Sequence, residues 1–355
     1  MEICRFSLSF NYSVAMMRRL SIALTILLSC ATSANAQDGY GEPLRPACIR
    51  NAELLLDEAL SLMKRNYYRR DSVNWQPLVE AAKKRLSQSS DCEAAYQSVQ
   101  WCFDQMKEQH SFIMPPVKAA LYSGNVNSSK LPITRSVTGP LLHELIESDM
   151  AYISVPWISS TDNAVCTGYA DSLQSLIRMF DQEGISKWII DLRNNTGGNC
   201  WPMLAGLGPL LGNGIHGYFV SSKERIPISY MNGVVLQGRQ SRFRVSDAYT
   251  LTQHKKTIII LTGEKTSSAG EIIALAFKGR DHVYLYGEPT AGLTTANATY
   301  PLSDGSLLVL TVCKEADRHG KIVEGKIYPD EFIESDRTGK DVVRDKAIMF
   351  LQLQE

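Results

Sequence analysis

The chain has 355 residues, and its 37 Lys and Arg balance its 37 Asp and Glu to a formal net charge of zero. Apolar residues make up 44% of the chain and charged residues 21%, which is typical of a folded globular protein and excludes a disordered chain, a collagen-like fibre and a coiled coil. The charge balance also argues against nucleic-acid binding driven by bulk charge, because neutralising phosphates requires an excess of Lys and Arg.

Residues 1–36 are predicted to be a signal peptide. A basic segment at 17–19 precedes a short apolar segment at 20–28, and the sequence A-N-A at 34–36 fits the pattern that signal peptidase cleaves. The apolar segment is too short to span a bilayer, and no run of about 18 apolar residues follows it. We therefore expect an exported protein of the periplasm or cell envelope without a membrane span. Lipid attachment at Cys30, in a lipobox-like context, is the alternative to simple cleavage.

The next part of the chain, residues 37–118, is predicted to be a small helical domain. Apolar residues recur at spacings of three and four between residues 51 and 106, as in about three amphipathic helices. A loop through His110, Pro115 and Pro116 follows these helices.

From residue 150 onward, strand and helix patterns alternate, which predicts a layered α/β core domain over residues 119–355. Short β-branched runs such as Ile258-Ile259-Ile260 indicate sheet strands that are covered by helices. We expect strands at residues 152–156, 187–192, 257–261, 282–286 and 306–312, and helices at 164–181, 200–211, 270–278 and 342–353.

Six cysteines follow the predicted signal peptide. They form no C-x-x-C pair and no Cys/His cluster at ligand spacing, so we expect neither a structural zinc nor another metal or cofactor. In an exported protein some of them could form disulfides, whereas as buried thiols they need no function, and the pairing stays open. The six are Cys48, Cys92, Cys102, Cys166, Cys200 and Cys313.

Two loops that follow predicted buried strands carry residues suited to acyl chemistry. In D-L-R-N-N-T-G-G-N, the adjacent Gly197 and Gly198 allow backbone N–H groups to point together at a negative oxygen. In T-S-S-A-G-E, Ser268 lies at the start of a helix, where the dipole favours an alkoxide. Local structure explains each loop equally well, as a tight glycine turn and as a helix N-cap with Glu271 completing a capping box.

The order of five motifs points beyond these local explanations. The motifs are D-L-R-N-N-T-G-G (191–198), T-S-S-A-G-E-I (266–272), G-E-P-T-A-G (287–292), L-S-D-G-S (302–306) and Y-P-D (328–330). This ordered set resembles the tail-specific, or C-terminal-processing, serine proteases, a family that includes the tricorn protease core and the retinoid-binding repeats of the eye. The resemblance spans residues 50–335 and implies a layered crotonase-like α/β core preceded by a small all-α domain.

The resemblance also implies which residues would carry the reaction. The nucleophile of the S-A-x-E motif corresponds to Ser268. One branch of the family has a general-base lysine at the position of Leu293, and leucine cannot take a proton. The tricorn-like branch instead has a histidine from the N-terminal side and a glutamate shortly before the P-D motif, which correspond to His110 and Glu324.

In that arrangement His110 removes the proton of Ser268 during attack on a peptide carbonyl and then protonates the leaving amine. Glu324 would orient the imidazole, directly or through an intervening hydroxyl. The implied activity is that of an exported serine endopeptidase acting on protein or peptide substrates. The oxyanion donors would be the N–H groups of Gly197, Gly198 and Ala269.

Two features depart from the family pattern. About 40 residues separate Phe112 from Tyr152, too few for the PDZ module of many members, so we expect none. The tricorn-like second serine corresponds to Gln109, and whether Ser111 substitutes for it is open. Because the same fold also occurs in non-enzymatic proteins, a catalytically weak binding module for peptides or apolar ligands is the alternative function.

Overall fold

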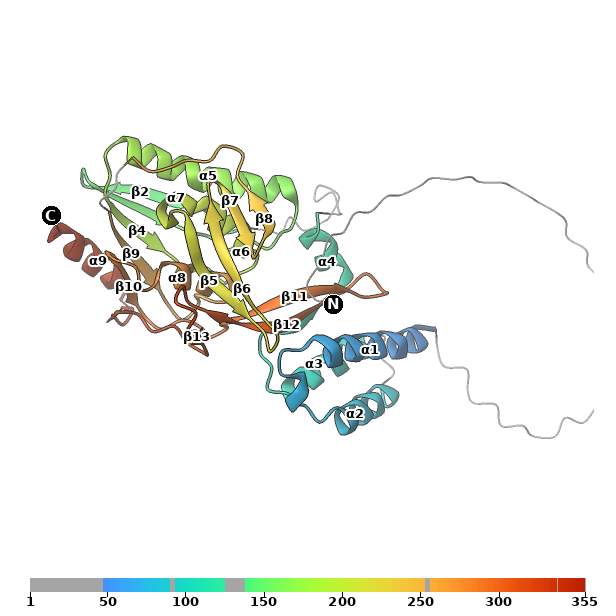
Figure 1. Cartoon of the computed structure of the whole chain (residues 1–355). Helices are drawn as coiled ribbons and strands as arrows, with labels where there is room; N and C mark the ends of the chain where they lie inside the picture. The colour runs from blue at the N-terminus through green and yellow to red at the C-terminus, as the bar shows by residue number, and fades with distance from the viewer. Residues whose placement is uncertain (1–46, 90–92, 125–137, 253–255, 337, 355) are drawn as a thin grey trace, which may run out of the picture. The chain divides into compact units, whose positions relative to one another are not determined.

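The computed structural model describes residues 47–89, 93–124, 138–252, 256–336 and 338–354 (Figure 1). The predicted signal peptide, with Cys30, lies outside these residues, as do Cys92 and the side chain of Cys48. No helix within the described ranges is long and apolar enough to cross a membrane.

A six-stranded sheet, counted within these ranges, belongs to the α/β core. Its strand order is β14–β10–β9–β4–β3–β2, and neighbouring strands are parallel except for β2 and β3. The apolar runs predicted as strands at residues 187–192 and 257–261 form the central strands β4 and β9. They are apolar because helices cover both faces of a parallel sheet. The strands are β2 (Leu142–Ile146), β3 (Met150–Ser154), β4 (Lys187–Asp191), β9 (Thr257–Thr262), β10 (Val283–Gly287) and β14 (Glu331–Phe332).

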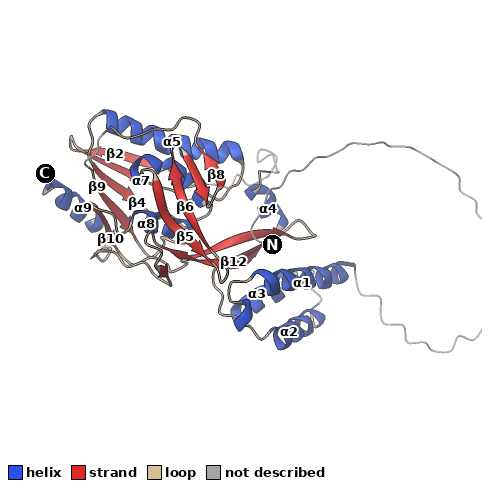
Figure 2. Cartoon of the chain, in the orientation of Figure 1, coloured by secondary structure: helices blue, strands red, loops and turns tan. Residues whose placement is uncertain are grey.

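Helices pack on both faces of this sheet (Figure 2). Trp188 and Ile190 of β4 share a buried cluster with the four helices between residues 163 and 277. Ile189 packs instead with the helix at residues 342–352. This alternation follows from the period of two along a strand. The predicted layered α/β fold is therefore confirmed. The helices are α5 (Asn163–Gln182), α6 (Cys200–Gly206), α7 (Gly208–Leu211), α8 (Ala269–Phe277) and α9 (Val342–Gln352).

A second sheet has eight strands within the described residues. Its order is β1–β12–β5–β6–β7–β8, and β11 and β13 also pair with β12. The sequence predicted β12 but no strand between residues 211 and 257, where β5 to β8 form antiparallel neighbours. The strands are β1 (Phe112–Met114), β5 (Gly214–Val220), β6 (Arg225–Met231), β7 (Val234–Gln237), β8 (Gln240–Arg244), β11 (Thr295–Pro301), β12 (Leu307–Ala316) and β13 (Ile322–Val323).

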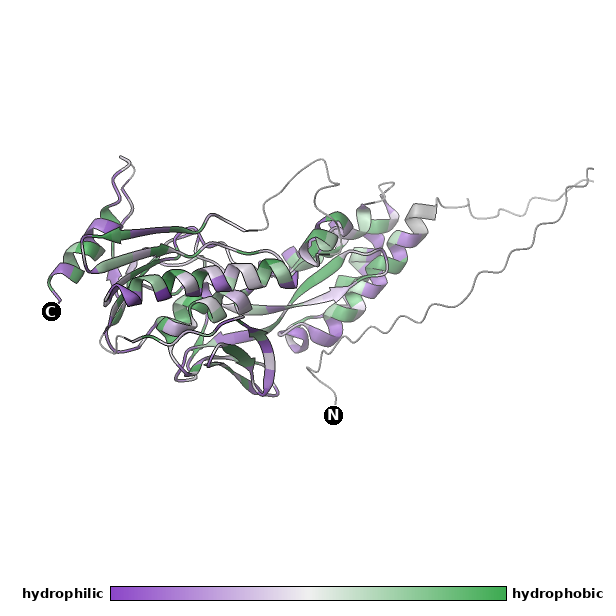
Figure 3. Cartoon of the chain, turned by 90° about the horizontal axis from the view of Figure 1, so that it is seen from above, coloured by the Kyte–Doolittle hydropathy of each residue, from purple (hydrophilic) through white to green (hydrophobic). Residues whose placement is uncertain are grey.

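The helical region packs directly on β12. Apolar and polar residues alternate along its helices (Figure 3), and its buried side chains form one cluster with Leu308 and Leu310 of β12. β1, which follows these helices, pairs with the same strand. The division of the chain at residues 118 and 119 remains a prediction. The helices are α1 (Ala47–Asn66), the 3₁₀ turn η1 (Arg70–Ser72), α2 (Trp75–Ser87), α3 (Ala94–Gln105) and, after β1, α4 (Pro116–Tyr122).

Shortening a leucine in this shared cluster should destabilise the protein. Leu310 is 0% exposed, so we expect Leu310→Ala to lower the free energy of unfolding by about 2–5 kcal/mol through lost burial and a residual cavity. Chemical denaturation measures the change. Leu142→Ala is the control, since Leu142 is also a strand leucine but is 55% exposed. Equal effects of the two substitutions would contradict the packing described here.

Candidate active site

The two loops singled out in the sequence lie against each other. They follow β4 and β9, which are adjacent parallel strands, so both loops leave the sheet at the same edge. The Ser267 N–H donates to the carbonyl of Asn195 at 3.1 Å. The Thr266 hydroxyl donates to the carbonyl of Leu192 at 2.8 Å. These bonds fix the glycine turn beside the serine turn.

Gly197 lies in close contact with the serine turn. It has a φ of +96°, and a Cβ there would come within 2.8 Å of both the Ser267 carbonyl oxygen and the Ser268 Cβ. A side chain would therefore push the serine turn away in addition to straining the backbone. Glycine is therefore required here for two reasons: the positive φ of the turn and the lack of space for a side chain beside Ser268.

Ser268 adopts a backbone conformation that is rare outside glycine, with φ 52° and ψ −117°. It directly precedes α8, and its Oγ lies 2.9 Å from His110 Nε2. Such strain costs on the order of 1–3 kcal/mol and persists where surrounding contacts over-determine it. The hydroxyl of Ser268 is directed to an imidazole.

Glu271 supplies one of those contacts. Its carboxylate is 0% exposed and accepts the Ser268 N–H at 2.9 Å, which is the glutamate half of the expected capping box. It also accepts bonds from the Thr290 hydroxyl and from the N–H groups of Gly292 and Leu293. Burial raises the pKa of Glu271, and these hydrogen bonds oppose that shift. Leu293 thus contributes a backbone N–H donor to the buried Glu271 carboxylate.

The His110 ring lies between Ser268 and a threonine. It is 9% exposed, and its Nδ1 lies 2.8 Å from the Oγ1 of Thr295 on β11. When Nδ1 carries the hydrogen, it donates to Thr295 and leaves Nε2 free to accept from Ser268. Burial lowers the pKa of His110 to about 4, and the charge of Glu108 opposes this shift. The imidazole is therefore neutral at pH 7, as a general base requires.

Of the three N–H groups expected to bind the oxyanion, two are free to do so within the described residues and one is not. The Gly197 N–H donates to the Asn195 side-chain oxygen at 2.9 Å, so it is already used, and that part of the prediction is corrected. The N–H groups of Gly198 and Ala269 donate to no acceptor in the part of the chain that the structure describes. A carbon built on Gly197 would lie 3.2 Å from the Ala269 nitrogen, so the glycine turn lies beside the start of α8.

The structure does not bring Glu324 to His110. Its side chain is 61% exposed and pairs with Lys314 of β12, which lowers the pKa of Glu324 through a hydrogen bond and charge attraction. Lys314 is the partner of Thr295 in the β11–β12 pairing. The lysine thus engages the carboxylate, and the threonine hydroxyl takes the place on the ring that the resemblance gave to Glu324.

Ser111 is also directed away from the ring. Its hydroxyl donates to Thr311 Oγ1 at 3.1 Å and accepts the Thr311 N–H at 2.9 Å.

Three residues near His110 were not found by sequence reasoning. Thr295 contacts the ring, Glu108 accepts the His110 N–H at 2.8 Å, and Asn297 donates to the His110 carbonyl at 2.8 Å. Thr295 and Asn297 lie 185 and 187 residues from His110 in the sequence. Glu108 is close in sequence but bonds to the main chain, so no residue pattern marks any of the three.

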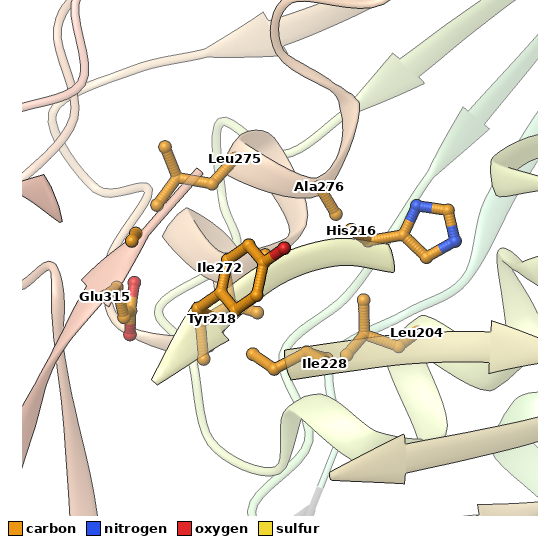
Figure 4. Close-up of a pocket in the computed structure, with 10 residues that line it drawn as sticks. Leu204, His216, Tyr218, Ile228, Ile272, Leu275, Ala276 and Glu315 are labelled. Carbon is orange, nitrogen blue, oxygen red and sulfur yellow. The ribbon is translucent and has the colours of Figure 1, made fainter. Parts of the chain in front are cut away.

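A small, largely apolar pocket lies beside α8 (Figure 4). Ile272, Leu275 and Ala276 of α8 contribute to its lining, together with His216 and Glu315. Within the described residues, no hydrogen-bond partner is present for either carboxylate oxygen of Glu315 or for Nδ1 of His216. Burial raises the pKa of Glu315 well above its ordinary value and lowers that of His216 to about 4. The His216 imidazole is therefore neutral at pH 7.

The four cysteines whose side chains are described are buried, and no disulfide joins any two of them: Cys102, Cys166, Cys200 and Cys313. Burial raises the pKa of the Cys102, Cys166 and Cys200 thiols, which disfavours the reactive thiolate. Across the described ranges, no group of three or more His, Cys, Asp or Glu residues could hold a metal ion.

Comparison with known proteins identifies the family. The model of peptidase family S41 matches residues 149–333, more than half of the chain. The chain belongs to peptidase family S41. The match includes the glycine turn, Ser268 and Glu324, whereas His110 precedes it. The resemblance to C-terminal-processing proteases is thereby confirmed, and this homology supports a function of the serine-protease type.

Three proteins that are similar to this chain carry different names. A nisin-resistance protein from Lactococcus lactis is 31% identical over 265 residues, which cover 73% of this chain and 76% of that one. A carboxyl-terminal-processing protease from Synechocystis is 31% identical over 160 residues, which cover 44% of this chain and 33% of that enzyme. A solved structure of a lipoprotein from Streptococcus agalactiae has a TM-score of 0.67 at 24% identity, covering 88% of this chain and 99% of that one; at that identity it supports the S41 fold alone.

Adding a methyl group at Gly197 should disable the serine turn. We expect Gly197→Ala to slow labelling of the protein by a fluorophosphonate at least about tenfold, because the new Cβ would displace Ser268. Gly184→Ala is the matched control, since Gly184 has a φ of +84° but nothing within 4 Å of a built Cβ. Both variants should lose on the order of 1 kcal/mol to backbone strain. Equal labelling of the two would contradict the contact between the loops.

Proposed function

We propose that this chain is a serine endopeptidase in which Ser268 attacks the peptide carbonyl and His110 acts as the general base. The observation that supports the proposal most directly is the 2.9 Å separation of His110 Nε2 and Ser268 Oγ, within the range for proton transfer. The rare backbone of Ser268 and the low pKa of His110 support it further. A serine that served only as a helix cap would need neither feature.

The reaction follows from these groups. The Ser268 oxygen attacks the carbonyl carbon while its proton passes to His110 Nε2, and the imidazolium then donates that proton to the leaving amine. Water releases the acyl group by the same two transfers. The N–H groups of Gly198 and Ala269 are the proposed donors to the oxyanion, and such donors contribute a few kcal/mol each. Thr295 fixes the tautomer of the ring by accepting from Nδ1, in place of Glu324.

The part of the chain before the described residues belongs to this proposal as a signal for export. Residues 1–36 would be removed, leaving Gln37 as the first residue of the mature protein, or Cys30 would carry lipid. The sequence pattern supports export. The N-terminal residue of the secreted protein, determined by mass spectrometry, decides between the two.

A second candidate role comes from the nisin-resistance protein of Lactococcus lactis, which is similar over 73% of this chain. A role in resistance to nisin would use the same Ser268 and His110. It is tested by comparing the growth of a nisin-sensitive strain that expresses the natural chain with one that expresses Ser268→Ala. Protection by both chains would point to binding without cleavage.

Replacing the nucleophile separates the peptidase from a binding module. We expect Ser268→Ala to abolish fluorophosphonate labelling and the cleavage of peptide libraries, since alanine has no oxygen to attack with. The thermal midpoint should stay within a few degrees of that of the natural chain, because Glu271 accepts its hydrogen bond from the main-chain N–H of residue 268, which alanine keeps. Ser267→Ala, the neighbouring control, should keep both activities. Labelling that persists in Ser268→Ala would move the nucleophile, and absence of labelling in the folded natural chain would favour the binding module.

The pH dependence should follow His110. The base works when neutral, and a pKa of about 4 keeps it neutral over most of the acid range. We therefore expect the labelling rate to stay level from about pH 8 down to about pH 5.5 and to fall below that, instead of falling near pH 6.5 as for an exposed histidine. His110→Ala should remove the activity.

Glu324→Gln is the control in that experiment. Because the Glu324 carboxylate is paired with Lys314, we expect Glu324→Gln to label at the rate of the natural chain. Its acid limb, the fall in labelling rate at low pH, should also match that of the natural chain. A rate governed by a group that titrates near pH 10, as a lysine does, would contradict the assignment of the base.

A further inference from the structure

Glu108 lies in the loop between α3 and β1, two residues before His110, and it is 7% exposed. Its Oε1 accepts the N–H groups of His110 and Ser111 at 2.8 and 3.1 Å and the Thr311 hydroxyl at 3.0 Å. Its Oε2 accepts the Tyr67 hydroxyl at 2.9 Å. No lysine or arginine pairs with it in the described part of the chain. Its charge is therefore held by neutral donors beside the histidine.

These bonds hold the His110 backbone on both sides. Glu108 binds the N–H, and the Asn297 amide donates to the carbonyl at 2.8 Å. The Thr311 hydroxyl lies 2.8 Å from Asn297 Oδ1 as well as 3.0 Å from Glu108 Oε1. The peptide units that flank His110 are thereby tied to β11 and β12, which limits the rotation of the backbone that carries the ring.

Tyr67 brings the helical region into this arrangement. It follows α1 directly, is 1% exposed, and donates its hydroxyl to Glu108. The next residue, Tyr68, donates its N–H to the Thr311 carbonyl at 3.1 Å. The end of α1 is thus bonded both to the carboxylate and to the strand beneath it.

We propose that Glu108 is the positioning residue for His110 and stabilises the positive charge that the imidazole acquires when Ser268 attacks. Its carboxylate acts through the main chain of the histidine and through space, whereas the usual triad acid bonds to the ring itself. This inference rests on the proposed function, because it matters only if His110 is the base.

The test uses the full chain and the second-order rate of labelling by a fluorophosphonate between about pH 3 and pH 8. In this reaction the Ser268 oxygen bonds to phosphorus, fluoride leaves, and the serine proton passes to His110. The variant Glu108→Gln keeps the shape of the side chain and removes its charge. Glu58→Gln is the matched control, because the carboxylate of Glu58 on α1 also accepts a backbone N–H, that of Ser303 between β11 and β12 at 3.0 Å.

We expect Glu108→Gln to label about tenfold to a hundredfold more slowly at pH 7 than the natural chain. Its acid limb should move to lower pH, because the charge that favours the imidazolium is gone. Glu108→Asp, which keeps the charge, should leave the acid limb in place. Glu58→Gln should match the natural chain in both respects.

Tyr67→Phe provides a second measurement that does not depend on the folding of Glu108→Gln. It removes one donor from the carboxylate, so the negative charge acts more strongly on the ring and the acid limb should move to higher pH. Shifts in opposite directions for the two variants are not expected of a residue that merely stabilises the fold.

The outcomes separate this inference from the function on which it rests. A natural chain that is not labelled at Ser268 would overturn the proposed function. A labelled natural chain with unchanged rate and acid limb in Glu108→Gln, or with an unmoved acid limb in Tyr67→Phe, would overturn the role of Glu108 alone.

Discussion

The 2.9 Å contact between His110 Nε2 and Ser268 Oγ joins side chains that are 158 residues apart in the sequence. Each side chain belongs to a different part of the fold, since His110 follows the helical region and Ser268 begins α8 of the α/β core. The contact forms only if the helices pack on β12, if β1 pairs with that strand, and if the loop after β9 leaves the sheet at the correct edge. The site therefore depends on the fit between two regions and cannot be built from either one.

Two buried glutamates hold the two halves of this contact. Glu271 accepts four hydrogen bonds around the serine turn, and Glu108 accepts four around the histidine loop. Burying a carboxylate is costly unless such donors replace its water. In both cases most donors are backbone N–H groups or neutral hydroxyls, so the carboxylates fix the geometry without introducing a positive charge beside the base.

The sequence was sufficient for the parts of the molecule that local pattern determines. The apolar runs around Ile189 and Ile259 predicted buried strands covered by helices, and the order of motifs led to Ser268 and His110. β5 to β8 were missed because strands such as β6, which reads R-I-P-I-S-Y-M, mix polar with apolar residues. Their pairing is a tertiary property that no single strand displays.

The errors around the site have the same origin. Glu324 matched the position of an orienting acid in related proteins, but Lys314, opposite Thr295 on the next strand, binds its carboxylate. Glu108 and Asn297 act on His110 through its backbone, and a main-chain partner leaves no residue pattern to recognise. Gly197 was correctly placed beside the nucleophile, yet its N–H is taken by Asn195. Sequence patterns identify reacting groups better than the groups that hold them.

The backbone of Ser268 has a consequence for how this chain could change over time. A φ of 52° at a residue with a side chain is strained, and glycine would adopt the same conformation without that penalty. Ser268→Gly would therefore relieve strain while removing the reactive oxygen. If Ser268 is the nucleophile, as proposed, a lineage selected for a durable fold alone would gain from losing its hydroxyl here, and stability and activity would be in direct competition at this position.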